Sequence, residues 1–520
     1  MTSAKGEQPL VCALYSTRIK FAWRGGGRHI KCQNTHVLNC NMPRYRCKHR
    51  RLLGSAGHFF AIATCFWLAI GLGFAQITQQ EAPEDAKINR QRGLAMLSEI
   101  KEALKEHYYD PTFHGINIDD RFRTAQERIK GLDSNAQIFR VIAQAVLDLE
   151  DSHTIFIPPS HYNRTEYGFS FQMVGNVCHI VNVKHGSDAE AQGLKDGDVV
   201  ASVANIIPAR NTLWTLQYLL YTLQPEAAVK VILRGADGSP RAVLVKSRIL
   251  TPAEQERERE QRAKLEKSLP ELKSTPFKCH EVNNDLIACK LYTFMIEPKV
   301  VDKMMKEVSA HKKLILDLRG NGGGAIETEA HLIGYFFDHD VKIGTEIRKN
   351  KRKDRFAKSR GDRVFTGQLL VLVDSNSASA SEVFARVVQI EKRGKIVGDV
   401  TAGQVMEAMF LNLTSVRGIA TVSLFGLEVT IADLVMSDGQ RLEGAGVIPD
   451  KAVGPTSFAL AKKTDPVLAY AISEFGVRLS AEDAGKYYFV RPVPEPSEEQ
   501  GASATQASTA ILTPSELNSR

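Results

Sequence analysis

Short apolar strands and helical segments alternate in the second half of the chain. Within residues 276–460 the runs KLILDL, QLLVLVD and KIVGD are β-rich, and a helical pattern follows each of the first two. Strands that alternate with helices are typical of βαβ units, in which helices cover a parallel sheet. We therefore expect an α/β core here.

Two of these strands end in segments that can carry chemistry. Leu314–Leu318 runs into RGNGGG, and Gln368–Val373 runs into DSNSASASEVFA, which places Ser379 near a strand-to-helix junction. Glycine runs expose backbone N–H groups that can hold an oxyanion or a phosphate. A nucleotide site is disfavoured because neither GK[ST] nor GxGxxG follows a strand. The serine is either a nucleophile or an ordinary helix N-cap.

Composition indicates a globular protein without a nucleic-acid partner. The chain has 520 residues, of which 43% are hydrophobic and 24% charged, and its net charge is +8. Residues 1–75 contain eleven Lys and Arg against one acid, so the remaining chain has a net charge of about −2. The basic excess therefore belongs to the N-terminus alone.

The N-terminus resembles an export signal. Residues 44–51 are strongly basic, residues 58–75 contain no charge, and small residues precede a cut after Ala75. The leader is too long for such a signal, so Met42 is the better start and the signal covers about 42–75. We expect an exported, periplasmic or extracellular protein. The alternative is an uncleaved membrane anchor.

Two cysteines of the mature chain lie on opposite sides of a hairpin-like turn. If Val282 faces Leu286 across Asn283-Asn284-Asp285, then Cys279 faces Cys289. A cross-strand disulfide would form in an oxidising compartment. Two unbonded thiols are the alternative.

The composition divides the chain into consecutive parts. They are a leader and signal (1–75), a helical cap (84–160), a β-rich part with a helix at 211–223 (164–250), a charged helical linker (251–275), the α/β core (276–475) and a disordered tail (490–520).

Four motifs of the core, in order, are LILDLRGNGGG, VDSNSASASEVFA, GDVTAG and DGQRLEGAGVIPD. Together they resemble the C-terminal processing (tail-specific) serine peptidase family. LEDSHTIFIPP resembles the end of that family's cap, and GFSF with GSDAEAQGLKDGDVVASV resembles its PDZ domain. The resemblance covers about residues 84–475. It implies an α/β multi-domain fold with a helical cap, a PDZ-like domain and a crotonase/ClpP-like core.

The resemblance makes Ser379 the expected nucleophile, but one branch of the family does not fit. Members of the Ser–Lys type carry a lysine where this chain has Gln404, and an amide cannot accept the serine proton. The tricorn-like branch uses Ser–His–Glu, and His153 and Glu443 match its base and its acid. Imidazole and carboxylate suit these roles. Asp438 and Glu382 are weaker candidates for the acid.

Two further sets of site residues follow from the resemblance. Backbone N–H groups that would hold the oxyanion belong to Gly322 or Gly323 together with Ala380. Groups that would bind a peptide C-terminus in the PDZ-like part belong to Gly168, Phe169, Ser170 and Phe171, with the apolar face of the 211–223 helix lining the pocket. In the alternative, that face fills a small core.

The expected function is that of an exported serine endopeptidase that cleaves peptide bonds through an acyl-enzyme. Its partners would be proteins or peptides with apolar C-termini, and the membrane would be met only through the signal or anchor. No metal or cofactor is expected, and an oligomer remains open. The alternative is a catalytically inactive protein of the same fold that binds peptides or an apolar ligand.

Overall fold

The computed structural model describes residues 83–159, 163–235, 237–268, 275–416 and 422–487. The leader and signal expected at 1–75 and the tail expected at 490–520 lie outside these residues. Of the described helices, none is both long enough and apolar enough to span a membrane.

The first described elements are helical. They are α2 (Pro83–His107), η1 (Phe113–Gly115), α3 (Ile118–Lys130) and α4 (Asn135–Leu147). The side chains of Asn117 and Ser134 cap α3 and α4 by accepting backbone N–H groups of the first turn. The apolar residues that recur at helical spacing, among them Ile100 and Ile142, are fully buried. We call these helices the cap.

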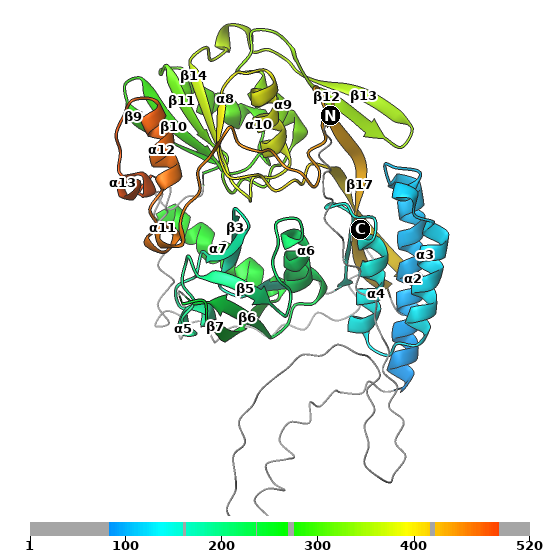
Figure 1. The fold of residues 1–520 in the computed structure, drawn as a ribbon. Coiled ribbons are helices and arrows are strands. Elements are labelled where there is room, and N and C mark those ends of the chain that lie inside the picture. Colours follow the sequence, from blue (N-terminus) through cyan, green and yellow to red (C-terminus); the bar gives the residue numbers. More distant parts are fainter. Residues whose placement is uncertain (1–82, 160–162, 236, 269–274, 417–421, 488–520) are drawn as a thin grey trace, which may run out of the picture. The chain divides into compact units, whose positions relative to one another are not determined.

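The cap packs against a group of antiparallel strands. They are β1 (Ile155–Ile157), β17 (Val422–Met436), β16 (Glu407–Val416), β12 (Val341–Arg348) and β13 (Lys351–Ala357). Phe425, Leu427 and Val429 of β17 share one apolar cluster with the buried residues of α2, α3 and α4. The cap helices therefore lie against a strand that comes much later in the chain (Figure 1).

A second, antiparallel sheet has the order β3-β4-β5-β6-β7. Its elements are β3 (Ser170–Val174), β4 (Val177–Val181), α5 (Asp188–Ala191), β5 (Val199–Val203), α6 (Leu213–Tyr218), η3 (Leu219–Leu223), β6 (Ala228–Arg234) and β7 (Pro240–Lys246). The helix expected at 211–223 therefore consists of a short α-helix and a π-helical turn. Beside the sheet, β2 (Arg164–Glu166) pairs with β8 (Arg248–Leu250).

The helix α7 (Pro252–Ser268) follows, and it has no buried residue. Its Glu and Arg side chains form ion pairs three and four residues apart, for example Arg262 with Glu266. Such a helix is stabilised by its own surface pairs, because it has no apolar face to pack.

The core is a six-stranded sheet of order β18-β15-β14-β11-β10-β9, parallel except at its β9 edge. The strands are β9 (Phe277–Asn283), β10 (Leu286–Leu291), β11 (Lys313–Asp317), β14 (Gln368–Val373), β15 (Lys395–Gly398) and β18 (Lys451–Ala452). The expected α/β fold class is confirmed.

Helices cover both faces of this sheet, as the βαβ pattern predicts (Figure 1). On one face lie α8 (Pro298–Val308), α9 (Ile326–Ile333) and α10 (Ala380–Ile390), and on the other lie α12 (Pro466–Glu474) and α13 (Ala481–Gly485). Shorter helices are η5 (Gly361–Arg363) and α11 (Ser457–Lys462). Successive residues of β14 alternate between the two apolar clusters. The strand is therefore buried on both sides.

The hairpin of β9 and β10 brings Cys279 and Cys289 into register, 4.0 Å apart at Cα, and they form a disulfide. The expected pairing of Val282 with Leu286 is wrong, because Leu286 faces Asn283 and the register shifts before Ile287. The irregularity lies at the turn, so it leaves the cysteine pair opposite each other.

Candidate active site

Ser379 lies between the end of β14 at Val373 and the start of α10 at Ala380. Its backbone has φ 55° and ψ −119°, a region that costs a non-glycine residue of order 1–3 kcal/mol. The Ser379 N–H donates to the Gln404 carbonyl (2.8 Å) and to the Glu382 carboxylate (3.0 Å). A serine on a strained strand-to-helix turn is typical of hydrolase nucleophiles, because the turn exposes the hydroxyl.

The glycine turn after β11 lies against this serine. A Cβ atom at Gly323 would lie 2.7 Å from Cβ of Ser379 and 2.8 Å from the Ala378 carbonyl, and the φ of Gly323 is +92°. Only glycine therefore fits here. Its N–H donates to Oδ1 of the buried Asn321 (2.9 Å), so it is not available to an oxyanion.

Within the described part of the chain, the N–H groups of the other two expected oxyanion donors, Gly322 and Ala380, remain unoccupied, unlike that of Gly323. Among the described residues, the N–H groups of Gly322 and Ala380 have no acceptor. Gly322 is exposed, and Ala380 is the first residue of α10, where helix N–H groups point outward without partners. These two amides can still receive an anion.

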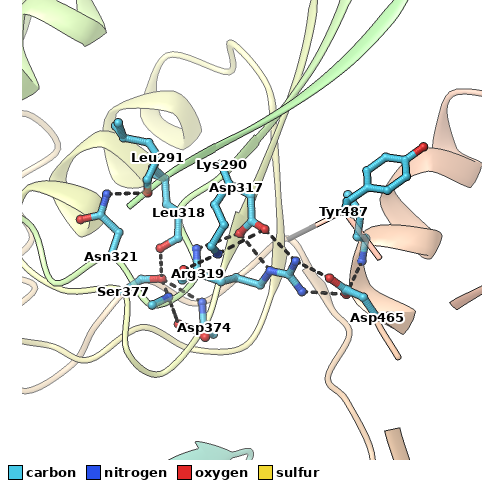
Figure 2. Close-up of polar contacts among 12 residues, drawn as sticks. Lys290, Leu291, Asp317, Leu318, Arg319, Asn321, Asp374, Ser377, Asp465 and Tyr487 are labelled. Atoms are coloured by element: carbon cyan, nitrogen blue, oxygen red, sulfur yellow. Dashed lines mark hydrogen bonds and ion pairs between the residues drawn. The ribbon is translucent and has the colours of Figure 1, made fainter. Parts of the chain in front are cut away.

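Hydrogen bonds join the two strand ends. The Ser377 hydroxyl donates to the Leu318 carbonyl (2.9 Å), the Gly320 N–H to Oδ1 of Asp374 (2.9 Å) and the Ala378 N–H to the Asn321 carbonyl (3.0 Å). Figure 2 shows Ser377 and Asp374 beside the end of β11. The glycine turn and the serine segment therefore form one rigid unit.

A cluster of buried ion pairs around Arg319 holds the start of the glycine turn. The Arg319 guanidinium makes paired hydrogen bonds to Asp317 (2.9 and 2.7 Å) and to Asp465 (2.8 and 2.6 Å), between which it lies in Figure 2. Burial raises the pKa of Asp317, but the charges of Arg319 and Lys290 outweigh it and hold that pKa at about 2. The cluster thus stays ionised and holds the turn in place.

Glu382 organises the segment that follows β15. Its buried carboxylate accepts hydrogen bonds from Thr401 Oγ1 (2.5 Å), Gly403 N–H (2.8 Å) and Gln404 N–H (2.9 Å), besides that from Ser379. Burial raises its pKa to about 7 against these hydrogen bonds. Glu382 therefore positions the serine and the 401–404 segment. Among the described residues, none of the hydrogen bonds of the Glu382 carboxylate involves His153.

The loop that carries His153 is fixed by Asp151. The buried Asp151 carboxylate accepts hydrogen bonds from the His153 N–H (3.0 Å), the Tyr108 hydroxyl (2.8 Å) and the Thr430 hydroxyl (2.8 Å). Burial and the Asp151 charge raise the pKa of Tyr108, so its hydroxyl stays a donor. The imidazole Nδ1 hydrogen-bonds to the Ser152 hydroxyl (2.8 Å), which leaves Nε2 as the free ring nitrogen.

Glu443 connects this loop to the core. One oxygen accepts the Ser152 N–H (3.1 Å) and the other accepts the Val405 N–H (2.8 Å). Val405 follows Gln404, whose carbonyl holds the Ser379 amide. The structure therefore brings all three expected residues, His153, Ser379 and Glu443, into one hydrogen-bonded chain of segments. Within the described residues, however, no hydrogen bond joins the His153 ring to Ser379 or to Glu443.

A second carboxylate near His153 was missed by sequence reasoning. Glu428 of β17 pairs with Ile155 and Phe410. Burial raises its pKa, the nearby His153 lowers it and Asp151 raises it, and the result is a raised pKa. A glutamate within the apolar run LFGLEVTIA was the available signal. Asp438, a weaker candidate acid, instead forms an ion pair with Arg386.

The segment expected to bind a peptide C-terminus leads into β3. Gly168 has φ +76°, and a Cβ there would lie 2.5 Å from Ser187. Ser170 begins β3, which pairs with β4 alone and is the edge of its sheet. The Met173 carbonyl of β3 accepts a hydrogen bond from Ser375 Oγ (2.7 Å). A loop of the core thus contacts this strand.

The helix beside this sheet is packed inside it. Leu213, Leu216 and Leu220 are buried in one apolar cluster with Phe169 and Phe171. These three leucines of the helix therefore contribute to the apolar core beneath the sheet.

No group of three or more metal-ligating side chains occurs among the described residues. The site described above contains a hydroxyl, an imidazole, carboxylates and backbone amides. Such a set suits acyl transfer.

Residues 287–453 match the model of peptidase family S41. This part of the chain is therefore similar to a peptidase S41 domain. Its expected relationship to C-terminal processing peptidases is confirmed, and the protein is a serine-type peptidase.

Two relatives match about two thirds of this chain. The carboxyl-terminal-processing protease of Picosynechococcus sp. is 22% identical over 366 residues, which are 67% of this chain and 80% of the relative. The chloroplastic carboxyl-terminal-processing peptidase 2 of Arabidopsis thaliana is 23% identical over 370 residues, which are 68% of this chain and 67% of the relative. Mature CPAF has a similar fold, with a TM-score of 0.53 at 14% identity over 72% of this chain and 94% of its own.

Proposed function

We propose that this peptidase is exported and cleaves polypeptides with Ser379 as nucleophile and His153 as base. The observation that carries the proposal is the Glu443 carboxylate, which binds Ser152 N–H and Val405 N–H and so joins the histidine loop to the serine segment. The strained backbone of Ser379 supports the same assignment.

The proposed reaction uses groups already named. With Nδ1–H donating to Ser152 Oγ, Nε2 of His153 takes the proton of Ser379 as the hydroxyl oxygen attacks the peptide carbonyl. The N–H groups of Gly322 and Ala380 hold the oxyanion. The imidazolium then gives its proton to the leaving amine, which breaks the C–N bond and leaves an acyl-enzyme. Water attacks the ester with His153 again as base and frees Ser379.

Carboxylates support the histidine in two ways. Both Glu443 oxygens accept backbone N–H groups, so Glu443 acts as a positioning residue for the loop. Glu428 lies close enough to His153 to interact with its charge, so it stabilises the imidazolium. Gln404 contributes its backbone, and it takes no proton.

Labelling of the purified full-length chain with a fluorophosphonate probe tests this assignment. We expect the wild type to be labelled and Ser379→Ala and His153→Ala to lose at least about a hundredfold in labelling rate, because both the nucleophile and its base are needed. Ser309→Ala and His107→Ala, which change the same residue types away from the site, are the controls.

Other outcomes decide between the candidates. Labelling that survives in His153→Ala would refute the histidine as base. A folded wild type that stays unlabelled, even with added peptide, would favour a binding protein of the same fold.

We also propose that the sheet β3–β7 is a PDZ-like module that binds substrate C-termini beside β3. Its support is the edge position of β3 and the glycine turn at Gly168, which lets backbone N–H groups face a carboxylate. Fluorescence anisotropy with Ser379→Ala should show a peptide with an apolar C-terminal residue binding about tenfold more tightly than its C-terminal amide. Equal binding of acid and amide would refute carboxylate recognition.

Export is supported by the Cys279–Cys289 disulfide, since such bonds persist in oxidising compartments. Peptide mapping without reductant of the chain recovered from its own producing cells checks this. Two free thiols at these positions would contradict export.

A further inference from the structure

Glu443 and Met406 line a cavity of about 770 Å³. Its walls are the connection from α2 to α3 (109–114), the turn of the β12–β13 hairpin (347–352) and side chains of β17 and the segment after it, including Asp433 and Arg441. The proposed mechanism leaves this space unused. It is large enough for several residues of a peptide.

The acidic groups of this cavity are mostly engaged by the protein. Asp433 pairs with Arg441 (2.7 Å), and Asp110 accepts the Thr112 and His114 N–H groups (2.9 and 2.8 Å). Asp151 and Glu443 hold the loop and core contacts described above. Only the side chain of Glu150, which is exposed at the wall, has no partner among the described residues.

Some basic side chains of the β12–β13 turn are paired and others are not. Arg348 pairs with Glu346 and Glu407, and Lys349 donates to the last carbonyls of α2. Lys351 and Arg352 are exposed, line the cavity and have no partner within the described chain. The adjacent Lys353 is likewise exposed. Like charges so close repel one another, and an anionic partner relieves that repulsion.

The charged side chains of the cavity that no other group of the described protein engages are therefore Lys351 and Arg352 on the hairpin turn and Glu150. A cationic ligand would meet Lys351 and Arg352, and a continuous polyphosphate would also meet Glu150. A peptide can direct its carboxylates toward the hairpin and leave uncharged positions near Glu150. Charge complementarity thus favours an acidic peptide.

We propose that this cavity binds an acidic segment of the polypeptide substrate, with its carboxylates on Lys351 and Arg352. The proposal rests on the proposed function, because Glu443 forms the wall shared with the active site. It makes the β12–β13 turn a specificity element: among substrates that reach Ser379, those with Asp or Glu near the scissile bond are held more tightly.

Binding to the full-length Ser379→Ala chain tests the proposal. A fluorescent peptide with four consecutive glutamates should bind about tenfold more tightly than the same peptide with glutamines, and salt should weaken the difference. The Lys351→Glu/Arg352→Glu variant should lose the preference. The Lys264→Glu/Lys267→Glu variant of α7, with the same change in net charge, should keep it.

Three results would overturn the proposal. They are equal binding of the two peptides to the parent chain, an undiminished preference in Lys351→Glu/Arg352→Glu, and displacement of the peptide by a single-stranded oligonucleotide at equal charge concentration. If the double variant fails to fold, Lys351→Gln/Arg352→Gln replaces it.

Labelling separates this proposal from the proposed function. The Lys351→Glu/Arg352→Glu chain with Ser379 intact should react with fluorophosphonate as the wild type does. A chain that is labelled but shows no acidic preference refutes only the cavity proposal. A chain that prefers the acidic peptide but is never labelled supports the cavity and refutes only the nucleophile.

Discussion

The backbone of Ser379 is held in a conformation that its residue type disfavours, and its neighbours explain how. Two acceptors from different segments, the Gln404 carbonyl and the Glu382 carboxylate, share its N–H. Gly323 leaves no space for the serine to relax toward the glycine turn. Strain at one residue is thus balanced by contacts made by several others.

Glu329 of α9 is a buried acid whose titration should affect stability. One oxygen meets Arg355 at 3.1 Å, and the other has no partner within the described residues. Burial raises its pKa to about 7, although the Arg355 charge opposes the shift. The folded state therefore keeps this proton longer than the unfolded chain does. The stability it contributes is full below pH 4.5, the ordinary value, and is lost as the pH rises to about 7.

When the pH rises from 4.5 to 7.5, the free energy of unfolding should fall less in Glu329→Gln than in the wild type, because the variant lacks this titration. We expect the two decreases to differ by up to about 3 kcal/mol. Urea unfolding at the two pH values measures it. Glu327→Gln, in an exposed position of the same helix, is the control. Burial also raises the pKa of Glu382. The stability of Glu329→Gln should therefore still depend on pH, but less than that of the wild type. Identical pH dependence in Glu329→Gln and the wild type would contradict the prediction.

At the scale of elements, the disulfide joins the edge strand β9 to β10. A disulfide between cysteines 10 residues apart lowers the conformational entropy of the unfolded chain. It should therefore stabilise the fold by about 2–3 kcal/mol. We expect dithiothreitol to lower the melting temperature of the wild type and Cys279→Ser/Cys289→Ser to melt at that lower temperature with or without reductant. A wild type that melts identically in both conditions would show that the bond adds no stability.

Elements were predictable where apolar patterns extend over several residues. The strands at 314–318 and 368–373 were placed within a residue, because a parallel strand buried on both faces is a continuous apolar run. The irregular register at Val282 was not predictable, since one extra residue near a turn leaves no mark in the pattern. The expected helix at 211–223 ends in a π-helical turn for which the sequence likewise has no signal.

The candidate site shows the same division. Motif resemblance predicted Ser379, His153 and Glu443, which the structure connects through hydrogen-bonded segments and which labelling has yet to test. Three of the four hydrogen bonds that converge on Glu382 come from residues 401–404, beyond the next strand, and Glu428 approaches His153 from a strand much later in the chain. A single sequence does not show such convergence, because it depends on how the sheets and the cap pack.

At the scale of the whole molecule, the contact between Ser152 and Glu443 spans 291 positions of the chain. A ribosome makes Ser152 first, Ser379 much later and Glu443 later still. Under the proposed mechanism a growing chain therefore holds its nucleophile before it can position its base. The proposed site is complete only after Glu443 has been made, so synthesis itself delays the first cut.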